Sequence, residues 1–308
     1  MITTVTLNVA IDKSYVIDEL KPGQVMRVQQ CTKTPGGKGL NVARVIKLCG
    51  EEVLATGFVG GHAGAYIEDL LREQQIRFDF SHTAQETRTC INILDSNWNS
   101  TEFLEPGEPV TEAELQDFLG KFAAVIEKSD VITISGSAPK GVGTDIYAKL
   151  VSIVKEKGKK VILDTSGGLL KEGIKACPTI IKPNREEVEA LLNISVDDFV
   201  ALVDGAKRLQ QKGIEMVVVS LGKEGALLVT EDAVYHGKPP KLNPVNTVGS
   251  GDSMVAAFAV GLARNLPVED MLRYAISVSA ANTLTMTTGS FKEEDRQNLY
   301  HQVTINRL

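Results

Sequence analysis

The sequence predicts an α/β protein built on a mostly parallel β-sheet. From residue 111 onward, short apolar runs typical of buried strands alternate with longer segments of helical spacing. This alternation indicates right-handed βαβ crossovers, which join parallel strands. Two glycine-rich turns, at residues 36–39 and 249–251, each precede a segment of helical pattern. Sheets of this kind bind their ligands at the carboxyl ends of the strands.

The composition fits a soluble globular protein with a sizeable core. The 308 residues are 43% hydrophobic and 23% charged, and the formal net charge is −6. An acidic chain does not hold a nucleic acid by bulk electrostatics, although small anions can bind in local basic pockets. No run approaches the roughly 18 apolar residues that a spanning helix needs. We therefore expect no nucleic-acid partner and no membrane partner.

The cysteines and the N-terminus indicate a reducing compartment. The four cysteines are widely spaced and form no C-x-x-C pair, which argues against a zinc site or a redox motif. The first residues contain neither the basic segment nor the long apolar segment of a secretory signal. A cytoplasmic protein is expected.

The N-terminal part is predicted to contribute one strand of the main sheet and part of a second, smaller one. Residues Ile2–Val9 alternate and are rich in Val and Thr, which predicts a strand with Asp12 at its carboxyl end. Residues Tyr15–Ile17 and Gln24–Val28, separated by Lys21-Pro22-Gly23, are interpreted as two short strands of a projecting sheet.

A hairpin is expected to complete this projecting sheet. Thr89–Leu94 and Thr101–Leu104 have strand patterns on either side of a polar turn at residues 96–100, with Arg88 at the entrance of the sheet. Between the two halves of the small sheet, the patterns predict a helix running to Leu48, a strand over Val53–Phe58 and a helix over Ala65–Gln74.

The remainder of the chain supplies the regular alternation. We expect helices over Thr111–Lys128, Asp145–Lys157, Glu186–Leu192 and Asp197–Gln211, and strands over Val131–Ser135, Val161–Leu163, Thr179–Ile181, Met216–Ser220 and Gly225–Val229. Asp12 and three polar segments then follow the ends of strands, and should lie at one edge of the sheet. These segments are 135–137, 182–184 and 220–222.

The turn at Gly249-Ser250-Gly251 opens a helix of small and apolar residues that continues to Leu262. A helix N-terminus presents unpaired N–H groups and the positive end of the helix dipole, and glycines allow an anion to approach that backbone closely. Asp252 lies in the first turn, where it either caps the helix or acts on a bound ligand. The sequence has neither a Walker pattern nor a G-x-G-x-x-G after the first strand, so another way of handling phosphate is indicated.

Several short motifs, in this order, resemble those of the ribokinase-like sugar kinases of the phosphofructokinase B family. Within that family they are most similar to the branch of tagatose-6-phosphate kinase and 1-phosphofructokinase. The similarity extends over essentially the whole chain and rests on Asn8–Asp12, Thr34–Val42, Thr87–Arg88, Ile134–Ser137, Ile181–Asn184, Ser220–Gly222 and Val248–Ser253.

The resemblance implies a role for each motif. Asp252 matches the family's catalytic base, and Gly249, Ser250 and Gly251 match its anion hole. The residues that match substrate-binding positions are Asp12, Arg27, Gly36, Gly37, Lys38, Asn41, Arg88 and Ser137, of which Arg27, Lys38 and Arg88 would hold the substrate's phosphate. The residues that match ATP-binding positions are Lys182, Asn184, Ser220, Gly222, Gly225 and Asn282. Asn184 and Glu187 match the N-x-x-E motif associated with Mg²⁺.

Simpler interpretations remain open for several of these side chains. Arg27 and Lys38 could be solvated surface charges, Glu187 could only favour the first turn of its helix, and Asp12 could cap a turn. The chain also departs from the family pattern, because many members have Asp where it has Asn246 and Pro where it has Val9.

The resemblance implies one ribokinase-like domain spanning residues 1–308. This would be a three-layer α/β fold whose β-sheet lid is formed by residues near 13–30 and 86–104, with a homodimer through the lid sheet. The implied reaction moves the γ-phosphate of ATP to a ketohexose phosphate. Tagatose 6-phosphate is favoured by residues 87–91 and 286–289, with fructose 1-phosphate as the alternative. A non-catalytic sugar-phosphate sensor is a more distant alternative, disfavoured by the presence of Asp252.

Overall fold

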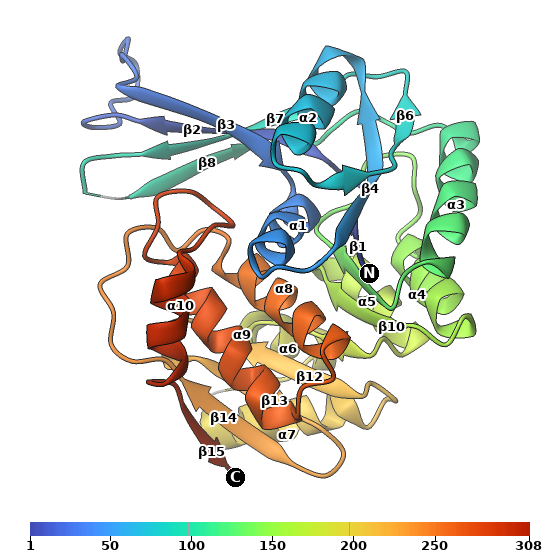
Figure 1. Ribbon diagram of the computed structural model, residues 1–308, viewed down its shortest axis with the longest axis vertical. Coiled ribbons are helices and arrows are strands. Elements are labelled where there is room, and N and C mark those ends of the chain that lie inside the picture. Colours follow the sequence, from blue (N-terminus) through green and yellow to red (C-terminus); the bar gives the residue numbers. More distant parts are fainter. Residues whose placement is uncertain (98, 197) are drawn as a thin grey trace.

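The computed structural model describes residues 1–97, 99–196 and 198–308, and these residues form two β-sheets flanked by helices (Figure 1). The larger sheet has eleven strands in the order β15-β14-β13-β12-β11-β10-β9-β1-β4-β5, with β6 paired to β4. The smaller sheet has four strands in the order β3-β2-β7-β8. The predicted turn at residues 96–100 contains Trp98 and the predicted helix over Asp197–Gln211 begins at Asp197; both residues lie outside the described ones.

The strands of the main sheet are β1 (Ile2–Thr6), β4 (Val53–Gly60), β5 (Arg77–Phe78), β6 (Ser81–Thr83), β9 (Val131–Ser135), β10 (Lys160–Asp164), β11 (Ile180–Ile181), β12 (Met216–Ser220), β13 (Ala226–Val229), β14 (Val234–Lys238) and β15 (Thr304–Arg307). The strands of the small sheet are β2 (Ala10–Val16), β3 (Gln30–Gly36), β7 (Arg88–Leu94) and β8 (Ser100–Leu104).

The α-helices are α1 (Lys38–Leu48), α2 (Gly61–Glu73), α3 (Glu112–Glu127), α4 (Ile146–Glu156), α5 (Gly167–Gly173), α6 (Arg185–Leu192), α7 (Phe199–Gln210), α8 (Ser250–Ala263), α9 (Val268–Asn282) and α10 (Glu293–Tyr300). Short 3₁₀ turns cover Ile174–Ala176 and Gly222–Glu224. In the described parts of the chain, no helix combines the length and the apolar character that crossing a bilayer would require.

The main sheet is mostly parallel, as the alternation of strands and helices predicts. Strand β1 pairs in parallel with both β4 and β9, and the parallel order continues through β10 and β11 to β12. Beyond β12, strands β13, β14 and β15 continue the sheet by antiparallel pairing. The carboxyl ends of β1, β9, β10, β11 and β12 therefore lie along one edge of the sheet.

Two hydrophobic clusters separate the helices into two layers, one on each face of the sheet. One cluster joins alternate strand residues such as Val218 to apolar residues of α1, α2, α8, α9 and α10. The other joins the intervening residues, such as Val217 and Val219, to α3, α4, α5, α6 and α7. Because successive strand side chains point to opposite faces, the central strands contribute to both clusters; these are β1, β4, β9, β10, β11, β12 and β13. The three-layer α/β prediction is confirmed.

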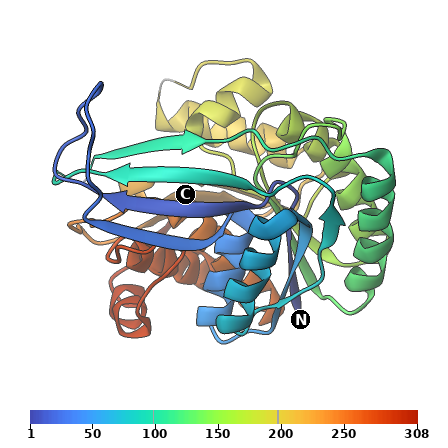
Figure 2. The same ribbon diagram turned by 90° about the horizontal axis from the view of Figure 1, so that it is seen from above.

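The small sheet projects from one end of the main body (Figures 1 and 2). In it, β2 pairs antiparallel with β3 and in parallel with β7, and β7 pairs antiparallel with β8. Strand β3 runs into α1 with only Gly37 between them. The predicted projecting sheet is therefore present, although its strands begin and end at other residues than predicted.

Two predictions near the N-terminus are wrong. The first strand ends at Thr6 and the chain turns at residues 7–9, so Asp12 lies inside β2 of the small sheet and not at the carboxyl end of β1. The alternating pattern continues across this turn, which lacks glycine and proline, and the two strands therefore look like one in the sequence. Residues Gln24–Val28 lie in an exposed loop, and the partner strand of β2 is β3.

Candidate active site

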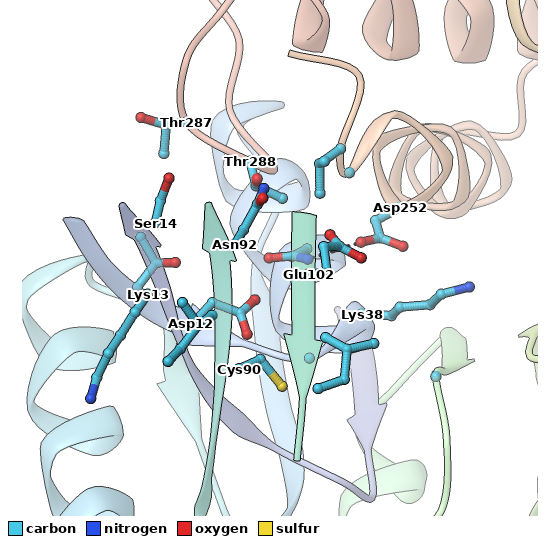
Figure 3. A pocket seen from close by; sticks show the side chains of 18 of the residues that line it. Asp12, Lys13, Ser14, Lys38, Cys90, Asn92, Glu102, Asp252, Thr287 and Thr288 are labelled. Atoms are coloured by element: carbon cyan, nitrogen blue, oxygen red, sulfur yellow. Dashed lines mark hydrogen bonds between the residues drawn. The ribbon is translucent and has the colours of Figure 1, made fainter. Parts of the chain in front are cut away.

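A cavity of about 620 Å³ lies where the small sheet meets the N-termini of α1 and α8 (Figure 3). Residues from β2, β7 and β8 line one side of it, and the turns that follow β9 and β10 line another. In Figure 3, Asp252 and Lys38 lie on one side of the cavity, and Asp12 and Ser14 of β2 lie on the opposite side. The predicted site residues that line this cavity are Asp12, Gly37, Lys38, Asn41, Arg88, Ser137, Gly249, Gly251 and Asp252.

Glycines leave the backbone at the N-terminus of α8 accessible. Gly249 has φ +79°, and a Cβ there would lie 3.0 Å from the backbone nitrogen of Gly289, so both the conformation and the space favour glycine. A Cβ on Gly251 would lie 3.5 Å from Lys182 Nζ, which places this ammonium beside the first turn of the helix. The helix dipole and the lysine therefore favour an anion at the same point.

Asp252 is a buried carboxylate in this first turn. It is 6% exposed and accepts a hydrogen bond of 2.9 Å from Asn41 Nδ2. Burial raises its pKa above the ordinary value, and the positive charges of Lys38 and Lys182 partly oppose that rise. A carboxylate with a raised pKa is a stronger proton acceptor, which suits a general base that faces a cavity.

Two lysines share a second buried carboxylate, Asp164. Lys182 Nζ lies 3.1 Å from Asp164 Oδ1, and Lys38 Nζ lies 3.6 Å from Asp164 Oδ2. The negative charge of Asp164 is the main cause that raises the pKa of Lys38. Sequence reasoning did not assign Asp164, although its place directly after a predicted apolar strand is the signal that could have found it. The arrangement holds two positive charges beside Asp252.

Asp12 faces the start of α1 from the small sheet. A Cβ on Gly36 would lie 2.1 Å from Asp12 Cγ, and Gly37 has φ +95°, so the glycines let this carboxylate approach the backbone. Burial raises the pKa of Asp12 to about 6, against the lowering effect of Arg44, Arg88 and the amide of Gly37.

The predicted phosphate-binding cations are placed differently from one another. Arg88 lines the cavity, and its guanidinium donates to the carbonyls of Asn8 and Glu105. Lys38 also lines the cavity, but its ammonium pairs with Asp164. Arg27 lies in the exposed loop between β2 and β3 and does not line the cavity.

Of the residues predicted to bind the nucleotide, most follow the ends of β11 and β12, and Asn282 ends α9; those after β11 and β12 are Lys182, Asn184, Ser220, Gly222 and Gly225. Asn184 and Ser220 line a second hollow of about 400 Å³ and form a bridge between their segments. Gly225 has φ +86°, and a Cβ there would lie 1.9 Å from the carbonyl oxygen of Gly237. Asn282 is buried and bonds the carbonyl of Val248 and the amide of Ser290, so it fixes the turn that leads to α8.

The Asn184-x-x-Glu187 motif forms a reciprocal capping box. Asn184 Oδ1 accepts from the amide of Glu187, and Glu187 Oε2 accepts from the amide of Asn184. The motif therefore fixes the start of α6, as the simpler interpretation of Glu187 requires. An ionised carboxylate has further lone pairs, so this bond leaves acceptor capacity on Glu187.

Comparison with known proteins shows that this chain is similar to carbohydrate kinases. The family model described as "pfkB family carbohydrate kinase" matches residues 5–295. Phosphofructokinase-2 from Escherichia coli in complex with potassium is 29% identical with a TM-score of 0.91, and the match covers 97% of this chain and 98% of that one. The tetrameric inhibited form of that enzyme matches with 29% identity, the same coverage and a TM-score of 0.90. A possible 1-phosphofructokinase from Thermotoga maritima is 28% identical with a TM-score of 0.92, covering 100% of this chain and 99% of that one.

The raised pKa of Asp12 predicts that this carboxylate destabilises the fold at neutral pH. Its unfolded-state pKa is about 3.9 and its folded-state pKa is about 6, so the folded state favours the protonated form, and stability is lost as the pH rises between these values. Asp12→Asn should therefore raise the free energy of unfolding at pH 7.5 by about 2–3 kcal/mol.

The increase in the free energy of unfolding of Asp12→Asn should disappear at pH 4, where Asp12 is mostly protonated in the folded parent protein. Urea denaturation at both pH values measures it, and Asp232→Asn, at an exposed residue, controls for the loss of one negative charge. An equal gain at pH 4 and pH 7.5 would contradict the assigned pKa.

Proposed function

Because this chain belongs to the pfkB family of carbohydrate kinases, we propose that it transfers the γ-phosphate of ATP to a ketohexose phosphate. The preferred acceptor is D-tagatose 6-phosphate, giving the 1,6-bisphosphate. The observation that carries the proposal is the buried carboxylate of Asp252, which lies in the first turn of α8 beside Lys38 and faces the cavity.

In the proposed mechanism, Asp252 accepts the proton of the acceptor hydroxyl as that oxygen attacks the γ-phosphorus. The bond from this phosphorus to the β,γ-bridging oxygen breaks, and ADP leaves with that oxygen. Asn41 holds the carboxylate by its bond to Oδ2. The amides at the start of α8 and the ammonium groups of Lys38 and Lys182 stabilise the charge that develops on the transferred phosphoryl group. The small sheet covers the cavity and limits the access of water.

ATP and Mg²⁺ are proposed as the co-substrate and the metal ion. Asn184, Ser220, Gly222 and Gly225 would hold the phosphates at the ends of β11 and β12. Glu187 suits Mg²⁺ because its carboxylate retains acceptor capacity beyond the capping box, and Mg²⁺ in kinases is often held by one or two carboxylates together with substrate phosphates. When bound, the metal ion neutralises charge on the phosphate chain.

The sugar phosphate would bind between the small sheet and α1. Asp12 and the backbone at Gly37 would contact the sugar hydroxyls, and Arg88 and Ser137 would lie toward its phosphate. The choice of tagatose 6-phosphate rests on the resemblance of residues 87–91 and 286–289, parts of which line the cavity. Fructose 1-phosphate is the second candidate, since the Thermotoga maritima protein carries the description of a possible 1-phosphofructokinase.

We also propose that two copies associate through the small sheet. Several apolar side chains on it and on its loop are exposed, by 94% for Val25, 42% for Val28, 56% for Phe103 and 65% for Leu104. A sheet that exposes several apolar side chains offers a surface for a protein partner, and in a symmetric dimer the second copy brings the same surface.

The test of the proposed function is a coupled assay of ADP release. Tagatose 6-phosphate should give the highest kcat/KM, ahead of fructose 1-phosphate, fructose 6-phosphate and the unphosphorylated hexoses. A higher kcat/KM for fructose 1-phosphate would move the assignment to that sugar. Turnover of unphosphorylated fructose as fast as of its phosphates would exclude a sugar-phosphate kinase.

Replacing the proposed base should separate binding from chemistry. Asp252→Asn keeps the size and the hydrogen-bonding shape but cannot take a proton, so kcat should fall by about 10²–10⁴ while calorimetry still detects both substrates. Asp270→Asn is a matched control, because Asp270 lies in the first turn of the neighbouring helix α9. A rate within a few-fold of the parent in the folded Asp252→Asn protein would remove Asp252 from this role.

The proposed dimer predicts that charged substitutions in the small sheet and its loop lower the molar mass of the protein in solution. The parent should elute as a dimer in size-exclusion chromatography with light scattering, and Val25→Asp/Phe103→Asp should shift it toward the monomer because charges would enter an apolar interface. Val200→Asp, at a residue 68% exposed on α7, should leave the dimer intact. A monomeric parent at micromolar concentrations would argue against association through the lid.

A further inference from the structure

Arg44 lies on α1 and its guanidinium is buried next to the cavity. The residue is 8% exposed. Its Nη2 donates to the carbonyl of Pro35 at 2.6 Å, and its Nη1 donates to the carbonyl of Thr288 at 2.7 Å and to Asn41 Oδ1 at 3.3 Å. One side chain therefore contacts the end of β3, the loop after α9, and the residue that holds Asp252.

The position of Arg44 is unfavourable for a cation by itself. Burial lowers its pKa to about 10, and the negative charges of Asp12 and Asp252 oppose that lowering. A buried arginine persists only when its donors are bonded, and the guanidinium fork provides several donors in a fixed geometry. The two bonds to carbonyl groups would be enough to anchor the fold. The third bond contacts Asn41, the residue that donates to Asp252.

Asn41 can accept at one end of its amide and donate at the other. Asn41 and Arg44 are three residues apart on α1 and so lie on the same face. Arg44 can only donate, and ionised Asp252 can only accept. If the amide turned over, its NH₂ group would meet the guanidinium and its oxygen would meet the carboxylate. Charges on both sides thus select a single orientation of the amide.

We propose that Arg44 is a positioning residue, which fixes the side-chain amide of Asn41 so that its NH₂ group always faces Asp252. Its catalytic consequence rests on the proposed function, because it concerns the orientation of the proposed base.

The same guanidinium ties the wall of the cavity to this point. Thr288 lines the cavity, and the next residue, Gly289, has φ +64°, where an added Cβ would lie 3.1 Å from Arg44 Nη1. The loop therefore packs directly on the arginine. Arg44 therefore contacts both the residue that holds Asp252 and the wall of the cavity, and so fixes their positions relative to each other.

Arg264, which follows α8, contacts the other end of α1 and provides a matched control. Arg264 Nη2 donates to the carbonyl of Cys49, which caps α1, and its Nε donates to Glu51. Arg264 does not line the cavity. Arg44→Met and Arg264→Met remove comparable tethers, but only the first removes a contact to Asn41.

The kinetic test is a double-mutant cycle with the best acceptor in the ADP-release assay. Arg44→Met should lower kcat by about 10- to 100-fold, and Arg264→Met should leave it within about twofold. In an Asn41→Ala background, Arg44→Met should change kcat by less than about threefold, because the amide that it orients is gone. An equal loss of kcat in both backgrounds would overturn the proposal.

The pH profile gives a second readout that a structural role would not change. The bond from Asn41 lowers the pKa of Asp252, so disturbing it should move the acidic limb of kcat to higher pH. Arg44 is itself a positive charge that acts on Asp252, so this profile is measured in Arg44→Lys, which keeps the charge. The other charged groups facing Asp252 are the same in the parent and in this variant: Lys38, Lys182, Asp164 and Asp12. An acidic limb at the parent's pH in the slowed variant would contradict the proposal.

A measurement without turnover separates this inference from the proposed function. The side-chain NH₂ resonances of Asn41, identified by their loss in Asn41→Ala, should shift in Arg44→Met and stay unchanged in Arg264→Met. Arg44→Lys, which keeps the charge but not the planar fork, should shift them too and serves if Arg44→Met does not fold. Unchanged resonances in the folded Arg44 variants would overturn the positioning role. A failure to phosphorylate any sugar phosphate would instead overturn the proposed function.

Discussion

The site depends on keeping carboxylates ionisable in a place with little water. Asp252 and Asp164 are both buried, and each would repel the other if no cation lay between them. Lys182 and Lys38 supply that compensation and also lie beside the first turn of α8. Buried charges of opposite sign hold one another only in good geometry, since removing one partner leaves an uncompensated charge. The positions of the strand ends and of α8 therefore have to be kept within narrow limits.

The three layers supply that geometry with rigid elements. Asp164 ends β10 and Lys182 follows β11, its neighbour in the sheet, so parallel pairing sets the distance between their backbones. Lys38 is the first residue of α1, and Asp252 lies in the first turn of α8, which packs against α1 in the same layer. Each charged group is thus attached to an element whose place is determined by the hydrophobic core on that face.

The sequence allowed the main sheet, the site turn and the family to be predicted, but not the internal contacts of the site. Strands such as Val131–Ser135 and Met216–Ser220 were predictable because apolar runs and their order carry the information. The break between β1 and β2 was not, because neither glycine nor proline marks it. Asp164 and Arg44 are ordinary charged residues in the sequence. Apart from Asn41, which is three residues from Arg44, their partners are distant along the chain or are backbone carbonyls, and only folding brings them together.

The direct connection from β3 through Gly37 to α1 determines where the sequence can accept insertions during evolution. The far end of the small sheet, with the loop at residues 17–29, is separated from Lys38 by the whole length of β3. Inserting residues into a surface loop costs little free energy, because the entropy of closing it grows only with the logarithm of its length. That tip is therefore free to diversify, acquiring new neighbours while the chemistry stays the same. Insertions near Gly37 would not be tolerated in this way, because β3 of the small sheet and Lys38, the first residue of α1, are joined there by one residue.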